Sequence, residues 1–150
     1  MSTTVLLADD HELMRHAIVQ FLEVEGANDI QILGQAASYA QTLELASGLR
    51  PRVILLDVYL KDKDGVTEAQ LGSALVGSRV LAMSLRIDDE TKTFAKTIGA
   101  VALLDKANLV SELIPAIRSC ANDQVVGLQN ETADKLPCAA SDEDSTSGKG

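Results

Sequence analysis

Polar residues that can do chemistry stand at the ends of four short apolar runs of this chain. They are Asp9 and Asp10, Asp57, Ser84, and Lys106. Apolar runs of this length predict strands buried on both faces, as in parallel sheets. A charged aspartate at the end of such a strand is costly unless a cation or strong donors meet it. Taken alone, Asp57 could equally well cap the loop that follows it.

The residue types favour phosphoryl transfer if the strand ends converge. Neighbouring carboxylates repel each other unless a hard cation lies among them, and Mg²⁺ takes one or two carboxylates together with waters and phosphate oxygens. A lysine and a hydroxyl that face the same point supply donors for a phosphoryl group. The residues therefore predict a phosphoryl-transfer site with Asp57 as the nucleophile.

Strand-like and helix-like segments alternate along the chain. Helical spacing of apolar residues, capping residues and glycine stops place the helices, whereas short aliphatic runs place the strands. The predicted strands cover 4–8, 30–34, 53–57, 79–84 and 100–104, and the predicted helices run from 11 to 26, 38 to 48, 66 to 75, 88 to 99 and 108 to 120.

This alternation predicts one α/β domain, a doubly wound five-stranded parallel sheet of (βα)5 type. Right-handed crossovers place helices on both faces, and the count fits the flavodoxin-like strand order 2-1-3-4-5. In such a sheet the functional crevice lies at the carboxyl ends of the strands, where Asp9, Asp57, Ser84 and Lys106 would meet.

Composition limits the classes of partner. The 150 residues are 46% hydrophobic but only 3% aromatic, so the core must be aliphatic. The net charge is −9, and residues 1–123 alone hold 17 acidic against 11 basic side chains. Such a surface repels phosphate backbones, so we expect no direct nucleic-acid binding by this chain.

Several features predict a cytoplasmic protein that does not enter a membrane. Cys120 and Cys138 lack metal-ligand spacing and do not form a disulfide framework. The N-terminus has no basic segment of a signal peptide, and no apolar stretch reaches the roughly 18 residues of a membrane-spanning helix. Residues 124–150 are linker-like and then rich in Ser and Asp, which predicts a disordered tail after a domain at 1–123.

The order and spacing of these motifs resemble the receiver domains of two-component response regulators. The resemblance covers residues 3 to about 121. It rests on Asp9-Asp10, the strand that ends at Asp57, Asp64-Gly65 after it, Ser84, and Lys106 after Gly99-Ala100.

The resemblance implies a role for each residue of the site. Asp57 would accept a phosphoryl group from a histidine kinase or phosphotransfer protein, and Mg²⁺ would be held by Asp9, Asp10, Asp57 and the backbone carbonyl of Tyr59. Lys106 would contact the phosphoryl group, and Ser84 would move toward it as the switch. The domain would be a signalling module, at most catalysing its own phosphorylation and dephosphorylation.

The start of the chain, from Val5 to Leu13, looks most like regulators of the LuxR/NarL type. Those proteins couple a receiver to a helix-turn-helix DNA-binding domain, which would make this chain the regulatory half of a transcription regulator. No such domain follows in the sequence, so a separate DNA-binding half and a stand-alone receiver both remain open. The output would be a protein–protein interaction or homodimerisation.

Some positions depart from the pattern of the family. Lys61 and Ala107 stand where many members have proline, and Leu103 stands where the switch aromatic is expected. Asp105 is unusual and could pair with Lys106 in competition with the phosphate.

Other interpretations remain open. Asp9 or Asp10 could cap the first helix, and His11 is interpreted as a surface residue at the helix start rather than a ligand. A haloacid-dehalogenase-like phosphatase is disfavoured because Tyr59 stands where its second aspartate is needed. A nucleotide-binding domain would need a glycine-rich loop at 9–12, but these residues are Asp-Asp-His-Glu, which disfavours that interpretation. A degenerate receiver that binds a partner without phosphorylation is the remaining alternative.

Overall fold

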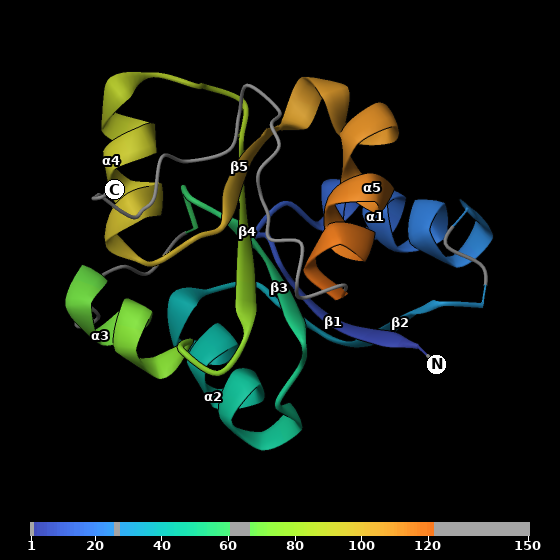
Figure 1. Ribbon diagram of the computed structural model, residues 1–150, viewed down its shortest axis with the longest axis horizontal. Coiled ribbons are helices and arrows are strands. Elements are labelled where there is room, and N and C mark those ends of the chain that lie inside the picture. The colour runs from blue at the N-terminus through green and yellow to red at the C-terminus, as the bar shows by residue number, and fades with distance from the viewer. Residues whose placement is uncertain (1, 26–27, 61–66, 122–150) are drawn as a thin grey trace, which may run out of the picture.

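The computed structural model describes residues 2–25, 28–60 and 67–121. Strands and helices alternate along these ranges (Figure 1). The strands are β1 (Thr3–Ala8), β2 (Ile30–Ala36), β3 (Val53–Asp57), β4 (Arg79–Ser84) and β5 (Ala102–Asp105). The helices are α1 (Glu12–Glu25), α2 (Tyr39–Leu49), α3 (Glu68–Ala74), α4 (Asp89–Thr97) and α5 (Leu109–Ala121), with a 3₁₀ helix, η1 (Lys106–Asn108), before α5.

The strands form one parallel sheet in the order β2-β1-β3-β4-β5. The predicted fold class and strand order are therefore confirmed: this is the flavodoxin-like α/β arrangement. Because every strand runs in the same direction, the carboxyl ends of β1, β3, β4 and β5 lie at one edge of the sheet.

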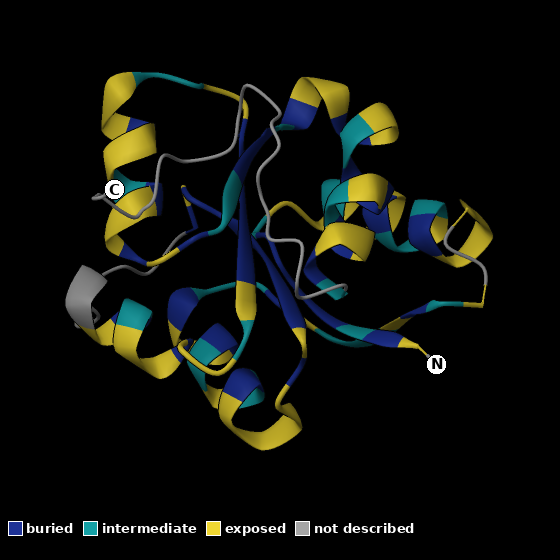
Figure 2. Ribbon diagram, in the orientation of Figure 1, coloured by how far each residue is buried: buried dark blue, intermediate teal, exposed yellow. Residues whose placement is uncertain are grey.

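Helices cover both faces of the sheet, with α1 and α5 on one side and α2, α3 and α4 on the other (Figure 1). Both faces of the central strands are thus buried, as Figure 2 shows, so their sequences are continuously apolar. Alternate residues of β1 and β3 enter different cores. Leu6, Ala8, Ile54 and Leu56 pack with α2, α3 and α4, whereas Val5, Leu7, Val53 and Leu55 pack with α1 and α5.

Side-chain caps explain where several helices begin. Ser38 accepts a hydrogen bond from the Gln41 N–H, as predicted, and Asp88 accepts one from the Thr91 N–H. Thr67 and Gln70 form a capping box, so α3 begins at Glu68, later than predicted.

The predicted end of α2 near Gly48 agrees with the structure to within one residue. The helix continues to Leu49, and Arg50 takes the left-handed conformation (φ 50°) and donates its N–H to the Ala46 carbonyl. Gly48 is inside the helix.

Three strands also differ from their predicted bounds. β1 begins at Thr3, one residue earlier than predicted. β2 continues past Gly34 to Ala36, and the register against β1 shifts between Val5 and Leu6. β5 begins at Ala102, because Ala100 still closes α4 by donating its N–H to Ala95.

Within the described ranges, no helix is long and apolar enough to cross a membrane. Lys61, Asp64-Gly65, Cys138 and the segment 124–150 lie outside these ranges, so what the sequence indicates about them stays a prediction.

Candidate functional site

The sheet brings together most of the polar residues that the sequence singled out. Asp9 follows β1, Asp57 is the last residue of β3, and Lys106 follows β5. The Asp9 N–H donates to the Ala36 carbonyl at 3.0 Å, so the end of β2 holds the Asp9 backbone in place. We call Asp9, Asp10, Asp57 and Lys106 the acidic site.

Lys106 joins two strand ends through its ammonium group. Its Nζ lies 2.8 Å from Asp9 Oδ2 and 3.2 Å from Asp57 Oδ2, and its side chain is only 3% exposed. Asp9 and Asp57 are buried as well. In this environment the ion pairs are screened little by solvent, and removal of one partner would leave a buried charge uncompensated.

The Asp57 carboxyl has a hydrogen bond or ion pair at each oxygen. Oδ1 accepts the Tyr59 N–H at 3.0 Å, while Oδ2 faces Lys106. Burial raises the pKa of this carboxyl above its ordinary value, and the charge of Asp9 acts in the same direction. The Tyr59 N–H and the Lys106 ammonium lower the pKa again, but burial has the larger effect.

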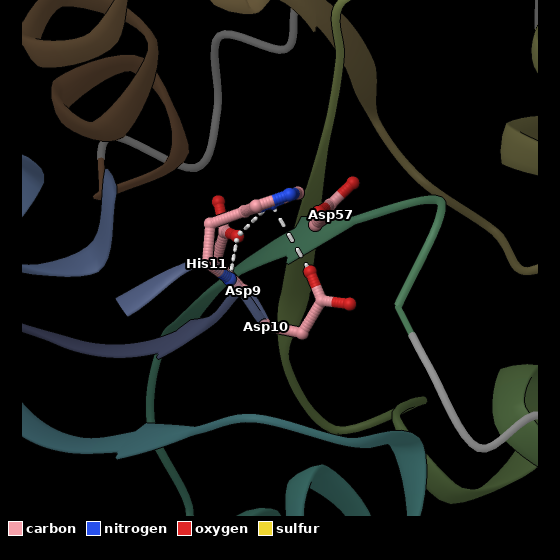
Figure 3. A group of neighbouring side chains, drawn as sticks. All are labelled: Asp9, Asp10, His11 and Asp57. Carbon is pink, nitrogen blue, oxygen red and sulfur yellow. Dashed lines mark hydrogen bonds and ion pairs between the residues drawn. The ribbon is translucent and has the colours of Figure 1, made fainter. Parts of the chain in front are cut away.

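Asp10 supplies an oxygen that no hydrogen bond satisfies. Its side chain is 7% exposed, and Oδ1 is buried and accepts no hydrogen bond. Figure 3 shows this carboxylate beside Asp9, His11 and Asp57, which offer ligand atoms that all lie within 4.8 Å of one another. In their ionised forms three carboxylates and one lysine leave two negative charges, so a divalent cation fits both the charge and the oxygen donors.

His11 lies closer to these carboxylates than its sequence position suggested. Its side chain is 71% exposed, as expected for a surface residue, but Nδ1 lies 3.4 Å from Asp9 Oδ1 and 3.2 Å from Asp10 Oδ1.

Comparison with known proteins agrees with this geometry. The family model of the response regulator receiver domain matches residues 5–118. The chain belongs to this family.

Similar proteins come from the LuxR/NarL group of regulators. The transcriptional regulatory protein LiaR of Bacillus subtilis is 31% identical over 133 residues, which are 88% of this chain and 62% of LiaR. The response regulator protein VraR of Staphylococcus aureus (strain Mu3) is 29% identical over 127 residues, 84% of this chain and 60% of VraR. The chain thus spans about three fifths of the length of these relatives.

A solved structure of a single receiver is matched over almost its whole length. It is the signal receiver domain of NarL from Mycobacterium tuberculosis, with 30% identity and a TM-score of 0.70, covering 81% of this chain and 97% of that one. This chain is therefore a two-component receiver domain of the LuxR/NarL type, a signalling domain.

Ser84, the last residue of β4, is buried in this receiver, and its hydroxyl is engaged within its own loop. Oγ donates to the Arg86 carbonyl at 2.8 Å and accepts the Arg86 N–H at 2.9 Å. Movement of Ser84 toward Asp57 would break both bonds.

The possible pairing of Asp105 with Lys106 is not formed in the structure. Asp105 Oδ1 accepts the Ala107 N–H at 2.9 Å and caps η1, while Lys106 extends toward Asp9 and Asp57. A short polar side chain next to a 3₁₀ start satisfies the backbone instead of the neighbouring lysine.

Two residues near the site were missed from the sequence. Arg15 Nη1 donates to the Asp9 carbonyl at 2.7 Å, and its Nε donates to Gln35 Oε1 at 3.1 Å. Arg15 lies on the polar side of the predicted helix at 11–26, which indicated only that its side chain would be exposed to solvent. Only the turn from β1 into α1 brings Arg15 back over Asp9.

Thr91 was the other residue missed. Its hydroxyl lies 2.9 Å from the Tyr59 hydroxyl and donates to Asp88 Oδ1 at 2.7 Å. The segment after Asp57 is thereby joined to the first turn of α4, although Tyr59 and Thr91 are 32 positions apart in sequence.

Proposed function

We propose that this receiver accepts a phosphoryl group on Asp57 from a histidine kinase or phosphotransfer protein. The observation that supports this most strongly is the buried contact of Lys106 with both Asp9 and Asp57. A purely structural carboxylate at a strand end would not need a second carboxylate and a lysine drawn from distant parts of the chain.

Asp9, Asp10, Asp57 and the carbonyl of Tyr59 would hold Mg²⁺. The buried, unsatisfied Oδ1 of Asp10 supports this assignment. When bound, the ion would neutralise the carboxylates and the oxygens of the incoming phosphoryl group.

Asp57 acts as the nucleophile in this proposal. One of its oxygens forms a bond to phosphorus while the bond from phosphorus to the imidazole nitrogen of the donor breaks. Lys106, already 3.2 Å from Asp57 Oδ2, then donates to a phosphoryl oxygen. The Tyr59 N–H holds the other oxygen of Asp57 and so fixes the direction of attack.

The response to phosphorylation would begin at Ser84. Its hydroxyl leaves Arg86 and turns to the phosphoryl group, which moves the loop into α4. Leu103, buried in β5, offers no hydroxyl to follow this movement, whereas the Tyr59–Thr91 contact reaches α4 directly. The output would be a homodimer or a downstream protein, and in a longer protein a DNA-binding half as in LuxR-type regulators.

The test is incubation with Mg²⁺ and acetyl phosphate followed by intact mass measurement. We expect one added phosphoryl group, lost in Asp57→Asn and kept in Asp105→Asn, a carboxylate at the same sheet edge that faces the η1 backbone. Equal labelling of Asp57→Asn would refute Asp57 as the acceptor.

A receiver that binds its partner without phosphorylation is the second candidate, and Leu103 favours it. It predicts no gain of mass at saturating acetyl phosphate with Mg²⁺, in a protein whose folded state is verified by circular dichroism.

A further inference from the structure

We propose that His11 is a further ligand of the ion held by Asp9, Asp10 and Asp57, so that the acidic site distinguishes imidazole-binding dications such as Mn²⁺, Co²⁺ and Ni²⁺ from Mg²⁺. The inference rests on the proposed metal role of the three carboxylates and adds a nitrogen donor to it.

The imidazole nitrogen points at the carboxylates. Figure 3 shows the ring of His11 next to Asp9 and Asp10, with dashed lines from its nitrogen to both. Octahedral donors bound at about 2.1 Å lie about 3.0 Å from one another. The observed separations of 3.2 Å and 3.4 Å from Nδ1 to Asp10 Oδ1 and Asp9 Oδ1 are close to this spacing.

The oxygens nearest His11 are those that Lys106 leaves unused. Asp9 presents Oδ2 to Lys106 and Oδ1 toward His11. The Oδ1 of Asp10, also next to His11, is buried and accepts no hydrogen bond. A buried carboxylate oxygen without a donor is destabilising, and a cation between these atoms would remove that cost.

The backbone holds His11 in this position. Its N–H donates to Asp9 Oδ1 at 2.9 Å, and its carbonyl accepts the Arg15 N–H at 2.9 Å as α1 begins. The imidazole itself is mostly exposed, so its replacement leaves the core and these backbone bonds in place.

Imidazole changes which ions the site favours. Mg²⁺ prefers oxygen ligands, whereas nitrogen from imidazole suits Mn²⁺, Co²⁺ and Ni²⁺ increasingly well along that series. Binding through Nδ1 requires the tautomer with its proton on Nε2. His11 should therefore add affinity for the transition ions and little for Mg²⁺.

Two measurements on the tag-free full chain test this. The first is the pulsed electron paramagnetic resonance spectrum of bound Mn²⁺, in which a ligand nitrogen produces ¹⁴N modulation. The second is titration of Mg²⁺ and Ni²⁺ by calorimetry at one fixed pH. The variants are His11→Ala, Asp57→Asn, and His16→Ala as the matched control, because His16 is the other histidine of the chain and is exposed on α1, which begins just after His11.

We expect ¹⁴N modulation in the parent chain and in His16→Ala, and none in His11→Ala. His11→Ala should weaken Ni²⁺ binding about tenfold or more and leave Mg²⁺ binding within about twofold. Modulation that persists in His11→Ala, or equal losses for both ions, would overturn the role of His11 while leaving the proposed function intact. Failure of every ion to bind, or binding unchanged by Asp57→Asn, would instead overturn the metal site of the proposed function together with this inference.

Discussion

The Asp57 carboxylate is held where its charge is costly, and this has a consequence for stability. Because the folded-state pKa is raised above the ordinary 3.8, the folded state keeps this proton to higher pH than the unfolded chain does. The contribution of Asp57 to the free energy of unfolding therefore falls as pH rises from the ordinary value through the folded pKa, and it stays low above that.

Replacing Asp57 by Asn should thus stabilise the protein at neutral pH. Without added metal, we expect the free energy of unfolding to rise by about 0.5–2 kcal/mol, since Lys106 keeps its contact with Asp9. Urea denaturation at pH 7 and at pH 3 measures this, and the gain should shrink at the lower pH. Glu44→Gln on the exposed side of α2 should change stability by less than about 0.5 kcal/mol, and a loss in Asp57→Asn would contradict the prediction.

Removal of Lys106 should have the opposite effect. In Lys106→Met the buried carboxylates of Asp9 and Asp57 lose their shared cation, which costs about 3–5 kcal/mol. Added Mg²⁺ should restore part of this stability and should raise the melting temperature of the variant more than that of the parent chain. If Mg²⁺ stabilised both proteins equally, the lysine and the ion would not be neutralising the same charges.

At the scale of the elements, the contact between Tyr59 and Thr91 joins the segment after β3 to α4. Tyr59→Phe removes one partly buried hydrogen bond, worth about 0.5–1.5 kcal/mol, and keeps the ring. We expect faster amide exchange in the first turn of α4 and unchanged exchange in α5. Unchanged exchange in α4 would show that the Asp88 cap alone holds this turn.

Two glycines in different backbone conformations form a matched pair for substitution by alanine. Gly99 has φ +78° after α4, so Gly99→Ala should lower stability by about 1–2 kcal/mol. Gly48 is inside α2, and a Cβ added there would meet no other atom within 4 Å, so Gly48→Ala should raise stability by about 0.5–1 kcal/mol. Chemical denaturation of both variants measures the difference, and changes of equal sign would be inconsistent with these backbone conformations.

The strands were easier to predict than the contacts around the site. β3 and β4 have the predicted bounds, because aliphatic runs buried on both faces have a clear signal. Local signals also placed two helix starts: Ser38 as a cap for α2, and the acidic run 88–90 for α4. The left-handed conformation that follows α2 could not be predicted, because the residue there is Arg50 and not a glycine.

Some contacts between distant segments could not be predicted from the sequence. Lys106 and Asp57, both polar and at strand ends, indicated a shared site. The contact of Arg15 with Asp9 depends on how α1 begins, and that of Thr91 with Tyr59 depends on how α4 begins. The sequence neighbours Asp105 and Lys106 suggested an ion pair. In the structure the Lys106 side chain points away from Asp105 toward Asp9.

At the scale of the whole molecule, the proposed output is a change in association. Phosphorylation adds up to about two negative charges at Asp57 and would alter the surface that α4 and α5 present. If pairing is the output, the phosphorylated chain should elute from a sizing column as a dimer and Asp57→Asn as a monomer under the same conditions. Identical elution with and without full phosphorylation would contradict dimerisation as the output. The downstream partner would then be a separate protein.

The contact between Lys106 and Asp9 spans 97 positions of the chain, and that with Asp57 spans 49. During synthesis, the three aspartates leave the ribosome long before the lysine that holds two of them together. A nascent chain that ends before β5 has the three aspartates but lacks Lys106, so the acidic site is incomplete. If Asp57 is the acceptor as proposed, we expect a chain truncated before β5 to gain no phosphoryl group from acetyl phosphate and Mg²⁺.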